Sequence, residues 1–465
     1  MGRSESDIIH RTRVAVISLV ALLMFGLVGG VVTWRIRLSQ AVDGQLAALR
    51  AAGLPTSGAE LNQWYPSVPD SENAARVLTQ AFALMRTFPD LRSNEVARFK
   101  PPPRGQPLNP DQVQLLSDYV NLNAAALETA ARAVKLPKSR YPVDWTPDFL
   151  ALLPHLGQLR SLAHAASFEA ILAIDSKKNA DAARSIVLLI RLAGTLDDEP
   201  EVNSQQARGA IIRMATSALE ASLRAGELSE ADSDSLGLLL AMAQRTNLLM
   251  RAFIGERALS IPYFRTKKAE AEEILRSTPD IDPDAEASID PVLLEPLQLW
   301  RRATGGFERD LRFYLGAMSN NIAVASLPLP RNPGITKLVA QDRDDALGHR
   351  YYFSAMLLPD VDRLLRREVE CSAHLNLAQS AVAVERFRLA TGRIPTDLVE
   401  LVPRFLAVPP VDPFDGAPLR YRQLSKGYLI YSVGPDGHDD NGKEPPATRR
   451  AADRGPEDIT FTVER

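Results

Sequence analysis

Asp360–Thr391 reads DVDRLLRREVECSAHLNLAQSAVAVERFRLAT, and this stretch decides the fold of the C-terminal part of the chain. Apolar and small residues recur in it every three or four positions, which is the period of an α-helix, and they form two adjacent stripes. The stripes consist of Leu375, Ala378, Val382 and Leu389 and of Leu377, Ala381 and Val384. Gly392 ends the pattern and Pro395 lies just beyond it, as at many helix C-termini. The sequence therefore predicts one long helix that is covered over a wide arc.

The residues after this helix predict a small sheet. Pro395–Leu406, PTDLVELVPRFL, has the composition of a short capped turn. Turn residues then frame two predicted strands at Leu419–Arg422 and Tyr428–Val433. Asp458–Val463, DITFTV, alternates polar and apolar residues as a third strand should. We expect a domain over residues 346–465 in which a long helix packs on a small antiparallel sheet.

This order of pieces resembles the soluble part of the major pseudopilin of type II secretion systems. The matching pieces are the helix end ATGRIPTDLVELVP, the turn and strand DPFDGAPLRY, the strand and loop IYSVGPDG, and the closing strand at Asp458-Ile459. They cover Ala373 to Ile459, under a fifth of the chain. A pseudopilin also has a prepilin leader that is cut before its membrane helix, and MGRSESDIIHRTR has no such motif. The resemblance therefore implies a pseudopilin-like end on a larger bacterial membrane protein, with secretion or envelope components as partners.

The resemblance also implies a calcium site in the loop that follows the second strand. In the major pseudopilin a backbone carbonyl and two aspartates bind the ion, and these positions fall on Val433, Asp436 and Asp458 here. Asp439 and Asp440 are further oxygen donors nearby, and calcium takes six to eight oxygen ligands. In this chain 21 residues separate Asp436 from Asp458, and the spacing is not that of an EF-hand. The alternative interpretation is a solvated acidic turn.

The residues before this domain predict a helical-hairpin body over residues 38–345. Abundant Ala and Leu, with only 6% aromatic residues, favour helices, so we expect a mostly α fold. Pro-rich loops interrupt the helical pattern at residues 277–296 and 327–334. The predicted helices include one capped by Ser71, one after Asn109-Pro110, a hairpin at 156–175 and 179–196, and a pair at 204–225 and 230–244.

An uncharged run near the N-terminus predicts a membrane anchor within residues 1–37. Val14–Trp34 has 21 residues without a charge, which is about 31 Å of helix and matches the bilayer core. A cleaved signal peptide is the alternative, but the run is too long and lacks a small-x-small site. Three arginines and the terminal amine precede the run, and only Arg35 and Arg37 follow it closely. This bias favours a cytoplasmic N-terminus and a periplasmic body, on a single-pass protein of the inner membrane.

Composition and motifs narrow the function classes. The formal net charge of −3 gives no basic field for a nucleic-acid backbone, so no nucleic-acid partner is expected. The single cysteine, Cys371, excludes an intrachain disulfide, and with His374 it lacks the further ligands of a metal site. The sequence has no HExxH, GxSxG, Walker or GxGxxG motif. We expect a membrane-anchored periplasmic interaction or scaffold protein and no enzyme, with a periplasmic hydrolase or polysaccharide-processing enzyme as the alternative.

Overall fold

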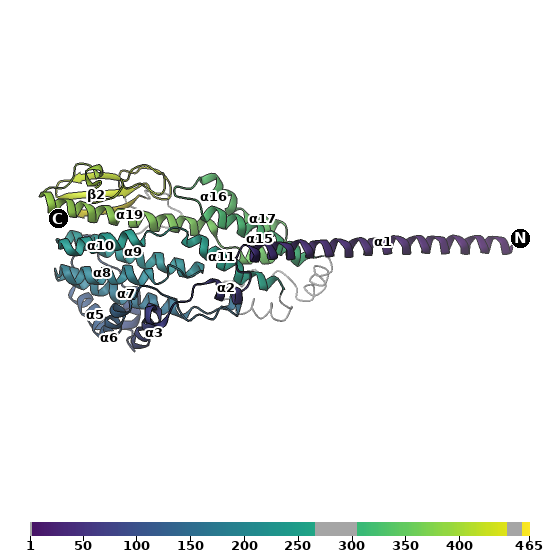
Figure 1. The fold of residues 1–465 in the computed structure, drawn as a ribbon, viewed down its shortest axis with the longest axis horizontal. Coiled ribbons are helices and arrows are strands. Elements are labelled where there is room, and N and C mark those ends of the chain that lie inside the picture. The colour runs from purple at the N-terminus through teal and green to yellow at the C-terminus, as the bar shows by residue number, and fades with distance from the viewer. Residues whose placement is uncertain (1, 266–304, 444–457) are drawn as a thin grey trace.

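The computed structural model describes residues 2–265, 305–443 and 458–465. The chain is mostly helical and carries a three-stranded antiparallel sheet near its C-terminus. Figure 1 shows an elongated body from which the first helix projects at one end, while the sheet and the C-terminus lie at the other end.

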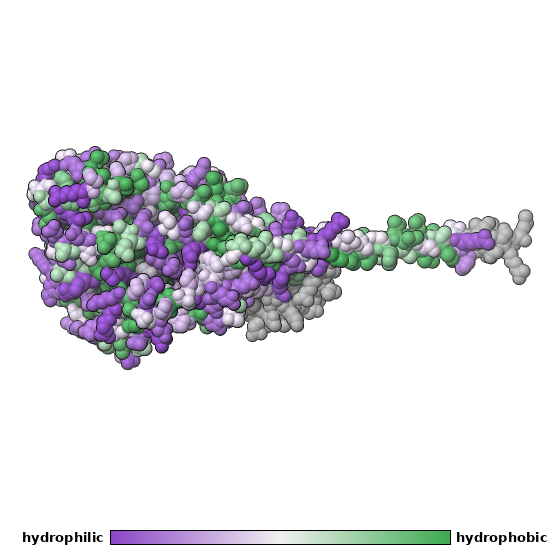
Figure 2. Space-filling view, viewed as in Figure 1, coloured by the Kyte–Doolittle hydropathy of each residue, from purple (hydrophilic) through white to green (hydrophobic). Residues whose placement is uncertain are grey.

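The projecting helix, α1 (Gly2–Ala51), contains the predicted anchor. Within the described residues it is the one helix that is long and apolar enough to cross a membrane, and its apolar stretch is exposed throughout. Figure 2 shows this stretch as an apolar band outside the body. The helix does not end at Trp34 but continues into the body, where Leu38, Val42 and Leu46 are buried.

The end of α1 is fastened to α15 (Gly306–Ala325). Arg35 forms an ion pair of 2.7 Å with Glu308, and the guanidinium of Arg309 lies 5.4 Å from the ring centre of Trp34. Gly305 has a φ of +67°, and a Cβ there would lie 2.9 Å from Leu38 Cδ2. The close approach and the left-handed backbone both favour glycine at this position.

The body consists of helices in hairpin-like succession. They are α2 (Gly58–Trp64), α3 (Ala74–Leu84), α4 (Arg92–Arg98), α5 (Pro110–Leu122), α6 (Ala124–Ala133), α7 (Pro154–Asp175), α8 (Asn179–Gly194), α9 (Val202–Ala225), α10 (Glu230–Ala243) and α11 (Leu248–Ser260). After α15 come α16 (Pro333–Ala340), α17 (Asp342–Gly348) and α18 (Tyr352–Leu357). Short 3₁₀ turns lie at Asp70–Glu72, Asp148–Leu150, Ile261–Arg265 and Leu398–Leu401.

Most predicted helices of the body are confirmed, and two details are wrong. The hairpin of α7 and α8 forms, and Asn109 caps α5 in a capping box with Gln112. The cap of α3 is Asn73 and not Ser71, because the Asn73 side chain accepts from Ala75 N and Arg140 N and so joins two segments. The single helix predicted after Pro110 is broken at Asn123, whose side chain accepts from Arg86 N. The predicted break at 277–296 lies outside the described residues.

The C-terminal helix and strands form close to the predicted positions. Helix α19 (Val361–Thr391) is capped by Asp360 and ends at Gly392, with a φ of +76°. Strands β1 (Arg420–Leu424), β2 (Gly427–Ser432) and β3 (Ile459–Glu464) pair antiparallel in that order. The predicted stripes are buried except for Leu389, which is 41% exposed. Leu389 lies in the last turn of the helix, beyond most of the packed face.

Helix α19 contributes to both main cores of the protein. Its later residues, from Cys371 to Phe387, share one apolar cluster with α3–α10 and with Tyr428 and Phe461 of the sheet. Its first turns share a second cluster with the end of α1, with α11 and with α15. The sheet is thus positioned on the helical body through α19, and β3 also contacts α9.

Candidate functional site

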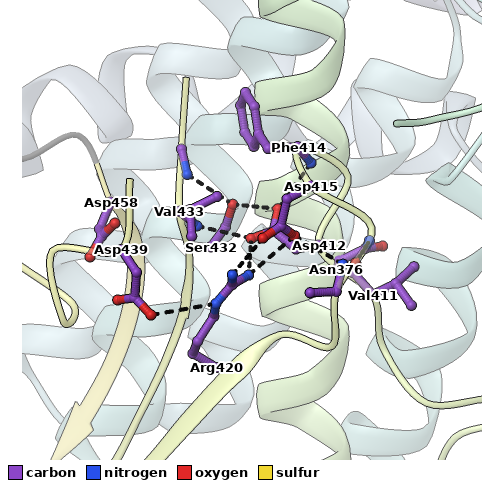
Figure 3. Close-up of polar contacts among 12 residues, drawn as sticks. Asn376, Val411, Asp412, Phe414, Asp415, Arg420, Ser432, Val433, Asp439 and Asp458 are labelled. Atoms are coloured by element: carbon purple, nitrogen blue, oxygen red, sulfur yellow. Dashed lines mark hydrogen bonds and ion pairs between the residues drawn. The ribbon is translucent and has the colours of Figure 1, made fainter. Parts of the chain in front are cut away.

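The buried carboxylate of Asp412 holds the start of the predicted acidic loop in place. It has no exposed surface, and its oxygens accept hydrogen bonds from Phe414 N (3.0 Å), Ser432 Oγ (2.8 Å) and Val433 N (2.9 Å). The Arg420 guanidinium donates a fourth bond at 2.8 Å (Figure 3). Because Asp412 precedes β1 and Val433 follows β2, this carboxylate fixes the start of the loop against the turn.

Arg420 extends the network toward the loop. It forms an ion pair of 2.5 Å with Asp415, and this bond lowers the pKa of Asp415. Its Nε lies 3.8 Å from an oxygen of Asp439 (Figure 3). One of the predicted ligands is therefore partly neutralised by an arginine.

Asp439 and Asp440 lie close enough to Asp458 to act on its titration. Burial raises the pKa of Asp458, and the two neighbouring carboxylates raise it further. The backbone N–H groups of Gly442 and Asp440 oppose the rise. Asp458 is 2% exposed, and its Oδ2 accepts from Gly442 N at 2.7 Å. Its Oδ1 is buried and has no hydrogen-bond partner among the described residues. A cation would satisfy this oxygen and neutralise its neighbours.

The other two predicted ligands have local partners. Asp436 Oδ1 accepts from His438 N at 3.1 Å, which closes an exposed turn. Val433 is buried and its N–H binds Asp412. Within the described parts of the chain, no three His, Cys, Asp or Glu side chains form a group that could hold a metal ion. The residues present thus fit calcium in charge and in one unsatisfied oxygen, but the described side chains do not form a complete metal site.

A separate cavity of about 410 Å³ lies where the two cores meet. Helices α9 and α19, the connection between α10 and α11 and the loop before α16 form its walls. Five arginines line it, and Glu368 is the acidic residue among the lining side chains. The lining arginines are Arg208, Arg213, Arg245, Arg331 and Arg367. Sequence reasoning missed this cavity, because its residues are distributed from Val202 to Pro413 without a local motif.

A buried carboxylate cluster also escaped the sequence analysis. His155 Nε2 lies 2.8 Å from Glu199 Oε1, and Ser204 Oγ donates to both Glu199 and Glu201. Burial raises the pKa of Glu201, and burial together with the Glu201 charge raises the pKa of Glu256 to about 8. These residues come from α7, the segment before α9 and α11, so no sequence spacing brings them together. No protein-family model, curated protein or solved structure matched this chain in the three comparisons made.

Proposed function

We propose that this chain is a single-pass protein of the bacterial inner membrane whose periplasmic body binds other envelope proteins, as an accessory of a type II secretion system or a related pilus-like machine. The observation that carries the proposal is the unbroken course of α1 from its exposed apolar stretch to the buried Leu46. An anchor that continues into the body as one helix would hold that body at a set position over the membrane. This suits a tethered binding protein.

The character of the arginine-lined cavity favours binding over catalysis. Its charged lining side chains are five arginines and one glutamate, and general acid–base hydrolysis typically uses a pair of carboxylates or a histidine in such a pocket. Arginines aimed at one space hold an anion in place. The role in secretion is supported by the pseudopilin resemblance, since a long helix beside a three-stranded antiparallel sheet is the arrangement it implies.

Site-specific crosslinking in living cells tests the proposed partners. Val408 lies on the C-terminal segment and is 69% exposed, so a photoreactive amino acid there would sample proteins that contact this end. The matched control is Leu152, an exposed apolar residue of the helical body. We expect secretion or pilus components to be captured from position 408 and not from position 152. The proposal is wrong if both positions give the same set of proteins, or if position 408 captures no envelope component.

The alternative function, a periplasmic hydrolase, is favoured by the pair Glu201 and Glu256. A carboxylic acid that keeps its proton near neutral pH beside a second carboxyl group is a common general-acid arrangement. The purified chain would be assayed against chromogenic glycosides, esters and phosphate esters. Hydrolysis that Glu256→Gln abolishes, and that Glu128→Gln leaves intact, would support this alternative over a purely binding role.

A further inference from the structure

The side chains that line the arginine-lined cavity carry an excess of positive charge. Asp197 pairs with Arg208 at 2.6 Å and lies 3.9 Å from Arg245, and Glu368 pairs with Arg331 at 2.7 Å. The side chains that line this half-open cavity include five arginines and one carboxylate, Glu368, a net charge of +4 (5 − 1). Asp197, Asp360 and Glu370 lie outside the lining and offset part of this charge at Arg208 and Arg367. Like charges gathered away from water repel each other, so an anion in the cavity would stabilise the protein.

Arg213 and Arg367 are the arginines most available to a ligand. The guanidinium of Arg213 has no hydrogen bond or ion pair to any described residue, although the side chain is only partly exposed. Arg367 donates to the neutral amide oxygen of Gln206. Burial and the charges of Arg363 and Arg213 lower the pKa of Arg367, and the charges of Glu370 and Asp360 only partly oppose this effect. Both side chains line the cavity from facing helices, α9 and α19.

Arg331 gives the cavity a buried, charged hydrogen-bond donor. Its side chain is 5% exposed, and one Nη donates to the carbonyl oxygen of Ala325 at 2.9 Å. Its Nε is buried and has no hydrogen-bond partner among the described residues. A buried charged donor without an acceptor is costly, and an oxygen of a bound ligand would satisfy it.

Aliphatic side chains make up much of the remaining wall, beside amide and hydroxyl side chains such as Gln205 and Ser372. Leu248, Leu327 and Leu375 are among the aliphatic residues that face the space between the arginines. A volume of about 410 Å³ lies in the range of small-molecule pockets. The cavity therefore suits a ligand with two unlike parts, and a bare inorganic ion would leave the apolar wall without contacts.

We propose that this cavity binds a small organic anion, whose phosphate or carboxylate group lies among Arg213, Arg331 and Arg367 and whose apolar part contacts the leucines. The inference deepens the proposed binding function and rests on it: the ligand would occupy the junction of the two cores and so tie the anchored part of the body to the part that carries the sheet. The head group and the apolar part are both needed for binding.

Calorimetric titration of the full chain in a neutral detergent tests this proposal with phenyl phosphate as the probe. We expect saturable binding at one site, at least about tenfold weaker binding of inorganic phosphate, and no binding of phenol. Arg213→Gln is expected to weaken phenyl phosphate binding about tenfold or more, because it removes a charge-assisted hydrogen bond. Arg98→Gln, the same change at an exposed arginine of α4, is the matched control and is expected to leave the dissociation constant unchanged.

The source of the anion is decided by repeating the titration in phosphatidylcholine nanodiscs with and without phosphatidylglycerol. Competition by the acidic lipid in wild type, and its loss in Arg213→Gln, would assign the head group to a lipid; no competition would assign it to a soluble anion. Both results support an anion site. Failure of phenyl phosphate to bind, or equal dissociation constants for wild type and Arg213→Gln, would overturn the inference. The crosslinking experiment on position 408 is independent of either result, so it tests the binding function separately.

Discussion

The carboxylate of Asp412 and the backbone N–H of Val433 are joined by a hydrogen bond of 2.9 Å that is wholly buried. The bond connects the turn before β1 to the residue after β2, and Arg420 closes the same network from within β1 at 2.8 Å from Asp412. The acidic loop that follows therefore begins from a fixed point, held by a charge-assisted hydrogen bond.

Asp412→Asn should destabilise the protein by about 3 kcal/mol, because it leaves Arg420 without its buried partner and turns a shared acceptor into a donor. Asp415→Asn removes the other carboxylate paired with Arg420, but its side chain is 32% exposed and should cost about 1 kcal/mol or less. Urea-induced unfolding in detergent, followed by circular dichroism, measures both. Equal losses for the two variants would mean that the buried network does not hold this end of the molecule.

The topology is tested best away from the native thiol. Cys371 is buried, so a membrane-impermeant maleimide should not reach it in the folded protein. A Val408→Cys variant in a Cys371→Ser background should be labelled in spheroplasts, because Val408 is exposed on the periplasmic body of the proposed topology. Alkaline phosphatase fused after Arg50 should be active. Absence of both signals, with a correctly inserted control, would reverse the orientation.

His374 is expected to make the protein less stable in mild acid. Burial and the nearby Arg213 charge lower the pKa of His374 from 6.5 to about 4, so the folded state disfavours the charged imidazole. As the pH falls below 6.5, His374 takes up a proton in the unfolded chain but stays neutral in the folded protein. The stability is therefore full above pH 6.5 and is lost toward pH 4, by about 2–3 kcal/mol.

A comparison of wild type with His374→Gln isolates this contribution from that of the carboxylates. Between pH 7 and pH 4.5 the free energy of unfolding of the variant, measured by urea-induced unfolding, should fall by about 2–3 kcal/mol less than that of wild type. Parallel losses in the two proteins would show that the imidazole is solvated and titrates near its ordinary pKa.

Much of the fold was predictable because its signals are local. The Asn109-Pro110 start of α5 and the glycine end of α19 each place the deciding residue within one turn of the boundary. The predicted boundaries were wrong where a side chain forms hydrogen bonds with the backbone of a distant segment. Asn73 displaces Ser71 as a cap because it also binds the backbone of Arg140, 67 positions away.

The functional surfaces were less predictable for the same reason. Asp439 and Asp440, predicted as further donors, lie near Asp458, and Asp412 was missed as the residue that fixes the loop. The five arginines of the cavity come from four separate regions of sequence, and none of them belongs to a recognisable motif. They converge because α9, α19, the connection between α10 and α11 and the loop before α16 pack against each other. The spacing of residues in the sequence carries no signal of that packing.

Glu256 should make the protein less stable in alkaline conditions. Its pKa is raised from 4.5 to about 8 by burial and by the charge of Glu201, so the folded state prefers the neutral acid. This stabilising preference is fully present below pH 4.5 and is lost as the pH rises through 8. Glu256→Gln should therefore be more stable than wild type at pH 9 by about 2–4 kcal/mol, with a much smaller difference at pH 5. Glu128→Gln, at an exposed position of α6, should show no such trend, and a shared trend would refute the assignment.

Calcium should stabilise the chain through the carboxylates around Asp458. The buried oxygen without a partner and the two neighbouring negative charges are both relieved by a cation, and the bound ion would tie β3 to the loop after β2. An ion at a hundredfold its dissociation constant stabilises by about 2.7 kcal/mol if it binds only the folded state. Millimolar calcium should raise the melting temperature of the full chain in detergent, and chelation should reverse the change.

The calcium response should depend on particular carboxylates and on pH. Asp458→Asn should abolish the calcium response, since it removes the buried carboxylate, whereas Asp415→Asn is the control because Asp415 is committed to Arg420. Asp436→Asn distinguishes the ligand set implied by the resemblance from the cluster around Asp458. The Asp436 carboxylate accepts a hydrogen bond from His438 N within its own turn, so the calcium response should be lost only if Asp436 is a ligand. Since the pKa of Asp458 is raised, protons compete with calcium sooner than at an ordinary aspartate, and the response should shrink as the pH falls. If wild type melts at the same temperature with calcium and with a chelator, the acidic loop is a solvated turn and no ion binds there.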